Sequence, residues 1–188
     1  LNFKKQLKQH LINIPGWRTN RKIVVFESDD WGASRMPSPK VYESLVGKGM
    51  GVEFSRYDTY DSLEKKEDVE ALVDVLNEVK DSRGNAGVFT ANMVMGNPDF
   101  EKIKGADFQE FYHEHFLDTY QRMYGQNLKW IWSKSIKEGL LFPQFHAREH
   151  LNVPLWMRDL KNGHKSTRLA FQYGFYGLKT NTSSPYQN

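Results

Sequence analysis

Two adjacent carboxylates are the first sign of chemistry in this sequence. Asp29 and Asp30 follow the apolar run 23–26 and precede Trp31-Gly32. Two carboxylates this close resist joint ionisation unless a cation sits with one of them. A metal ion on one carboxylate would leave the other free to act as a base. The competing interpretation is an ordinary turn, because Asp and Gly are common loop residues.

A pair of histidines is the second sign. His146 and His150 are four residues apart, so they can face one ion from a turn of helix or a tight loop. Neutral imidazoles suit Zn, Co, Ni or Fe. The alternative is a pair of polar residues that cap a helix or make a core hydrogen bond. Because the chain has no cysteine, any metal must rely on His, Asp or Glu. The two pairs together favour a metal site.

The histidine segment also fits a second enzymatic pattern. Residues 146–150 read H-x-x-E-H, in which Glu149 would be the general base of an inverted zinc peptidase. Such an enzyme needs a carboxylate ligand further along, and Asp159 is the only acidic residue after His150. This hypothesis also leaves the Asp pair without a role, so it ranks second. We predict no site at His113-Glu114-His115, which falls in an expected helix.

The elements that must position these residues alternate along the chain. Strands are predicted at 22–28, 86–95 and 140–142, the first of them buried on both faces. Helices are predicted at 2–13, 38–46, 64–81, 107–124, 127–138 and 154–160. The charge run 64–70 is expected to form a solvated helix face.

This order predicts an α/β fold with a parallel sheet, in which chemistry gathers at the carboxyl ends of the strands. The Asp pair and the His pair each follow a strand, so both are expected on the same side of the domain. Three or four strands are too few to close a barrel of seven or eight. Either the barrel is incomplete in this chain, or weak strands follow residue 165.

Bulk composition limits the other classes of function. The 188 residues suit one domain, 1–188, with a helical insertion at about 98–139 and a flexible tail at 180–188. A net charge of +3 from 26 basic and 23 acidic residues gives no reason to propose nucleic acid as a partner. No apolar run approaches the roughly 18 residues of a membrane span. Residues 1–14 do not form a signal peptide, and neither the compartment nor the oligomeric state is predicted.

The chemistry-bearing segments resemble a known family. Val24 to Gly32 resembles the first motif of the polysaccharide deacetylase (NodB-type) superfamily, an apolar strand that runs into D-D-x-G. His146 to His150 resembles its second motif, H-x-x-x-H, and Gly87 to Asn92 resembles the strand between them. The resemblance covers residues 20–155 and is nearest to the bacterial polysaccharide deacetylase-like branch.

The resemblance implies a distorted (β/α) barrel and a metal-dependent hydrolase that removes acetyl groups from an N- or O-acetylated carbohydrate. By position, Asp30, His146 and His150 would bind a divalent ion, expected to be Zn with Co, Ni, Fe or Mn as alternatives. Asp29 would be the catalytic base. Arg148 is expected to assist catalysis by steering a carboxylate or polarising the oxyanion, or else to face a structural acid.

The sequence also departs from the superfamily's pattern. The later motifs are absent, so no general acid is assigned, and a non-catalytic carbohydrate-binding relative remains an alternative.

Overall fold

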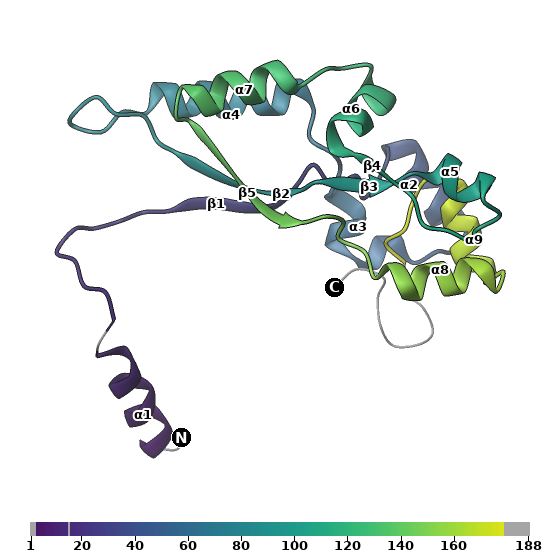
Figure 1. Cartoon of the computed structure of the whole chain (residues 1–188), viewed down its shortest axis with the longest axis horizontal. Helices are drawn as coiled ribbons and strands as arrows, with labels where there is room; N and C mark the ends of the chain where they lie inside the picture. The colour runs from purple at the N-terminus through teal and green to yellow at the C-terminus, as the bar shows by residue number, and fades with distance from the viewer. Residues whose placement is uncertain (1–2, 15, 179–188) are drawn as a thin grey trace.

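A computed structural model describes residues 3–14 and 16–178 of the chain (Figure 1). The strands are β1 (Phe26–Trp31), β2 (Phe89–Val94), β3 (Gly96–Pro98), β4 (His113–His115) and β5 (Leu141–Ala147). The helices are α1 (Phe3–Asn13), α2 (Pro39–Gly47), α3 (Arg56–Tyr60), α4 (Lys66–Glu78), α5 (Phe100–Gly105), α6 (Phe116–Tyr124), α7 (Lys129–Lys137), α8 (Val153–Lys161) and α9 (Lys165–Gln172), with a 3-10 turn, η1, at Val52–Phe54.

Three parallel strands form the central sheet in the order β1-β2-β5. Phe26 pairs with Phe89, and Phe89 pairs with Leu141, so the three strands run in register. The predicted α/β class with a parallel sheet is therefore confirmed. Within the described residues the sheet is open, with β1 and β5 at its edges, and these strands close no barrel.

One face of the sheet is covered by helices. Figure 1 shows α4 and α7 lying side by side over this face, beside the hairpin that joins α4 to β2. Val69 and Leu76 of α4 belong to one hydrophobic cluster with Ile131 of α7 and with Ala91 and Met93 of β2. This packing holds the central strand β2 in place. Because β1 and β5 both pair with β2, it also sets where these two strands end.

The prediction that residues 22–28 are buried on both faces is wrong. Strand β1 begins only at Phe26, and residues 21–29 are all exposed. The physical reason is that β1 is an edge strand, and no described element covers its outer face. An apolar run indicates a strand, but it does not reveal whether a covering layer is present.

A second hydrophobic cluster lies beyond the carboxyl ends of the strands. Leu45 of α2, Ile103 of α5, Trp156 of α8 and Phe171 of α9 are all buried in it. Figure 1 shows these helices gathered at one end of the sheet. This cluster holds the segments that follow β1 and β5, so it positions the ends of the two strands that carry the predicted ligands.

Most of the predicted helices are confirmed, with one clear exception. Helices α1, α2, α4, α7 and α8 match the predictions. The prediction of one helix over 107–124 is wrong, because β4 pairs antiparallel with β3 and α6 begins only at Phe116. Left-handed backbone at Asp107 and Phe108, with φ of 49° and 59°, breaks the helical path.

Two further expectations concern the ends of the chain. After residue 165 the structure has helix α9 where weak strands were considered. The predicted tail at 180–188 lies outside the described residues. Among the residues that the structure describes, no helix is long and apolar enough to cross a membrane.

Candidate metal centre

The end of β1 is bent into a turn, and we call residues 28–35 the acidic turn. The pairing with β2 shifts register between Ser28 and Trp31, and Asp30 adopts a left-handed φ of 67°. Gly32 follows with a φ of 84°. A Cβ atom at Gly32 would lie 2.6 Å from the carbonyl oxygen of Val94, so the position requires glycine. This irregular backbone allows two adjacent aspartates to take up different environments.

Side chains from distant parts of the sequence brace this turn. The backbone N–H of Gly32 donates to both carboxylate oxygens of Glu64 at 3.1 Å. The hydroxyl of Tyr120 also donates to Glu64. On the other side, the Asn97 amide donates to the Gly32 carbonyl at 2.9 Å and accepts the Ser34 N–H at 2.7 Å. The turn is therefore held by buried hydrogen bonds on both sides.

Three of the predicted site residues come together beside this turn. Asp30, His146 and His150 each offer a ligand atom, and these atoms all lie within 4.8 Å of one another. The Nε2 atoms of His146 and His150 lie 3.5 Å and 3.9 Å from Asp30 Oδ1. The two imidazole rings are stacked, with centroids 5.6 Å apart. Strand β5 carries His146, and His150 follows just beyond its end, in the segment 146–150 that we call the imidazole segment.

The two oxygens of Asp30 have different partners. Oδ2 accepts a hydrogen bond of 2.6 Å from the guanidinium of Arg35. Oδ1 is buried and accepts no hydrogen bond from any described residue. A buried carboxylate oxygen without a donor is costly unless a cation or another donor satisfies it. One carboxylate oxygen and two imidazoles form a donor set that zinc and similar divalent ions accept, with a position left open. The residues present therefore fit such an ion.

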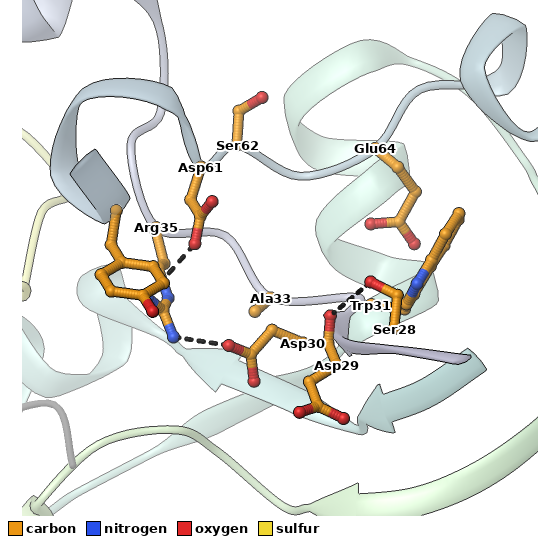
Figure 2. Close-up of a pocket in the computed structure, with 10 residues that line it drawn as sticks. Ser28, Asp29, Asp30, Trp31, Ala33, Arg35, Asp61, Ser62 and Glu64 are labelled. Atoms are coloured by element: carbon orange, nitrogen blue, oxygen red, sulfur yellow. Dashed lines mark hydrogen bonds and ion pairs between the residues drawn. The ribbon is translucent and has the colours of Figure 1, made fainter. Parts of the chain in front are cut away.

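The neighbouring Asp29 lies outside this group of ligand atoms. Its side chain is exposed, and its Oδ1 accepts a hydrogen bond of 2.7 Å from the Asn92 amide on β2. Asp29 and Asp30 both line a pocket of about 430 Å³, which Figure 2 shows with Arg35, Asp61 and Glu64 around it. The pocket is thus lined by Asp30, which belongs to the ligand group, and by Asp29, which is held separately.

The predicted catalytic Arg148 lies in a different setting. Its guanidinium pairs with the carboxylate of its neighbour Glu149 through two hydrogen bonds. This carboxylate raises the pKa of Arg148, and the arginine side chain is more than half exposed. Neither residue lines the pocket around Asp29 and Asp30. Two settings were expected for Arg148, assistance in catalysis or contact with an acidic side chain. The structure shows the contact with an acidic side chain.

Several polar residues around the site were not predicted. These are Arg35, Asp61, Glu64, Asn92 and Asn97. The prediction of a solvated face for 64–70 is wrong at Glu64, which is enclosed against Tyr120. Burial raises the pKa of Glu64, and the hydrogen bonds from Tyr120 and Gly32 oppose the shift. Burial also raises the pKa of Asp61, while the Arg35 guanidinium lowers it. One usable signal for these residues is the placement of Arg35 only five residues after Asp30.

The other histidine cluster stays apart from this centre. His113 and His115 lie in β4, where the Nδ1 atom of His115 accepts the Leu117 N–H at the start of α6. Within the described residues, neither contributes a ligand atom to the group at Asp30. The helix expected at this cluster is absent, because these residues form β4.

Comparison with known proteins adds no assignment to this geometry. No family model, no curated protein and no solved structure matches the chain.

Proposed function

We propose that this chain is a metal-dependent hydrolase that removes an acetyl group from an N- or O-acetylated carbohydrate, with the fold and site of the NodB-type deacetylases. The observation that carries the metal site is the buried Oδ1 of Asp30, which has no hydrogen-bond donor among the described residues and faces two imidazoles. The acetylated carbohydrate rests on the resemblance of residues 24–32 and 146–150 to the two motifs of that superfamily.

In this proposal Asp30, His146 and His150 hold one divalent ion, with zinc expected first. When bound, such an ion supplies Lewis acidity, which lowers the pKa of a water molecule and polarises a carbonyl oxygen. Asp30 and His146 belong to two strands that β2 separates, so the sheet itself sets the spacing of these two, and His150 follows the end of β5. The pocket that Asp29 and Asp30 line is wide enough, at about 430 Å³, for a small substrate group.

Asp29 is the base in this proposal. Its Oδ1 is engaged by the Asn92 amide, so Oδ2 is the oxygen that can receive a proton from water. The side chain is exposed and is free of the arginine that holds Asp30, and Figure 2 shows its carboxylate turned away from Asp61 and Glu64. Asn92 therefore orients the carboxylate without neutralising it.

The zinc peptidase alternative has less support. Its general base would be Glu149, and both oxygens of that carboxylate are taken by Arg148. The segment 146–150 is the end of a strand and the loop after it, so the two histidines do not lie on one turn of helix. That hypothesis also gives no role to Asp29.

The test is acetate release from N-acetylglucosamine oligomers and from acetylated xylan, with the protein loaded with zinc or cobalt. Asp29→Asn should lower the rate by about 10²- to 10⁴-fold while metal binding is retained, because it removes a general base and no ligand. The matched variant Glu149→Gln should retain the activity.

Two results would contradict the proposal. Loss of activity in Glu149→Gln together with an active Asp29→Asn would favour the peptidase. Metal binding without acetate release from either substrate would favour the non-catalytic relative.

A further inference from the structure

Arg35 is buried at the centre of the site, and the resemblance gives it no role. Its side chain is 5% exposed, and its guanidinium contacts three other segments of the chain. One nitrogen, Nη2, lies 2.6 Å from Asp30 Oδ2 and 3.2 Å from His150 Nδ1. The other, Nη1, lies 3.2 Å from Asp61 Oδ2, and the guanidinium carbon Cζ lies 5.2 Å from the centroid of the Tyr57 ring. Figure 2 shows the guanidinium between the two carboxylates.

This contact makes the two oxygens of Asp30 unequal. A free aspartate can bind a metal through one oxygen or through both. Here the charged hydrogen bond from Arg35 occupies Oδ2, while Oδ1 is left without a donor and faces His146 and His150.

Charge balance explains why Asp61 is also needed. A guanidinium next to a divalent ion is repelled by it, and an unpaired buried cation is strongly destabilising. Asp61 supplies a second carboxylate on the side of Arg35 that faces away from Asp30. The three charges Asp30, Arg35 and Asp61 sum to −1, so the array remains attractive to a cation.

We propose that Arg35 is a positioning residue that makes Asp30 a ligand through Oδ1 alone, and that Asp61 holds Arg35 in this place. The inference rests on the proposed metal site. Hydrogen-bonded partners of this kind orient metal ligands, and their removal typically weakens metal binding by about 10- to 100-fold.

The experiment measures the zinc affinity of the full chain by calorimetry and the metal's ligand shell by X-ray absorption. Arg35→Met should weaken zinc binding by about 10- to 100-fold and should add one carboxylate oxygen to the ligand shell. Arg35→Lys should recover part of the affinity, because a lysine keeps the charge but cannot hold both carboxylates. The control Arg158→Met removes an arginine that also pairs with an aspartate, Asp159, and should change neither quantity.

Wild-type affinity in a folded Arg35→Met protein would overturn the inference. A weaker affinity with an unchanged ligand shell would also overturn it, because charge alone would then explain the loss. If Arg35→Met fails to fold, Asp61→Asn decides, since Asp61 is 41% exposed and its replacement leaves Arg35 with Asp30. In Asp61→Asn, a smaller loss of zinc affinity with the same added carboxylate oxygen would support the inference. An unchanged zinc affinity and an unchanged ligand shell would refute it.

These outcomes are distinct from failure of the proposed function. A wild-type protein that binds no zinc would remove both proposals. A wild-type protein that binds one ion, with Arg35→Met indistinguishable from it, would remove only the role of Arg35.

Discussion

The acidic turn and the imidazole segment supply ligands to one candidate site, yet they are held in different ways. The acidic turn is fixed by side chains: Glu64 and Asn97 bind the Gly32 backbone, and Arg35 binds Asp30. The imidazole segment is fixed by backbone pairing, since the N–H groups of Met95 and Gly96 donate to the Ala147 and Arg148 carbonyls. The carboxylate therefore depends on packing, whereas the histidines depend on strand register.

This difference predicts how substitutions behave in each region. In the acidic turn, changes to the supporting residues should reduce both folding stability and metal affinity, because the supports are buried. In the imidazole segment, where Arg148 is exposed and His146 is one-third exposed, changes should leave stability nearly intact. The following predictions test this contrast, from the largest effect to the smallest.

Gly32→Ala should give the largest loss of stability. The substitution forces a left-handed φ of 84° on a residue with a Cβ, and that atom would lie 2.6 Å from the Val94 carbonyl oxygen. We expect the free energy of unfolding in urea to fall by about 3 kcal/mol. Gly49→Ala is the matched control, with a φ of 67° and open space around it, and should lose about 1 kcal/mol. Equal losses would contradict the close packing at Gly32.

Asn97→Ala should give the next largest loss. Asn97 is buried, and its removal leaves the Ser34 N–H and the Gly32 carbonyl without their side-chain partner. The free energy of unfolding in urea should fall by about 2 kcal/mol, the usual effect of leaving buried polar groups without a hydrogen-bond partner. The exposed Asn85, whose amide donates to Asp81, serves as the control. Asn85→Ala should lose less than about 1 kcal/mol.

Glu64→Gln should change how stability depends on pH. Burial raises the pKa of Glu64 above its ordinary value of 4.5, so the folded state holds the proton to higher pH than the unfolded state does. The stability from this proton is complete below pH 4.5 and is lost as pH rises through the folded-state pKa. The free energy of unfolding of wild type minus that of Glu64→Gln should therefore decrease as pH rises above 4.5. A constant or rising difference in urea titrations would contradict the burial of an acid here.

Arg148→Gln should have the smallest effect on stability. The Arg148 side chain is 57% exposed while that of Glu149 is 10% exposed, so loss of this ion pair should lower the free energy of unfolding by about 1 kcal/mol, at the upper end for exposed pairs. Zinc affinity should also remain unchanged, because Arg148 lies outside the group of ligand atoms. Urea unfolding and calorimetry check both points. A fall in acetate release with unchanged zinc affinity would instead support the catalytic role predicted from the sequence.

The sequence predicted the parts of the site that depend on strand order. Parallel strands end on the same side of a sheet, so a carboxylate after one strand and histidines after another were expected near each other. The structure does bring Asp30, His146 and His150 together, although β2 separates the strands that carry them. The family, the reaction and the substrate stay predictions.

The parts that were missed depend on contacts between residues far apart in the sequence. Glu64 appeared to belong to a solvated charge run, because nothing in residues 64–70 shows that Tyr120 would enclose it. Asn97 appeared to be only a turn residue, although it binds the acidic turn from 65 positions away. The prediction that residues 22–28 are buried was wrong for a related reason. The residues of a strand do not show whether another element of the chain covers that strand.

Metal analysis of four purified proteins tests the central claim most directly. Wild type should retain one equivalent of zinc after dialysis. Asp30→Ala and His146→Ala should each lose it, because each removes one of three ligands. His113→Ala removes an exposed histidine of β4 and should retain the metal. Zinc retained at the wild-type level in both Asp30→Ala and His146→Ala would contradict the account.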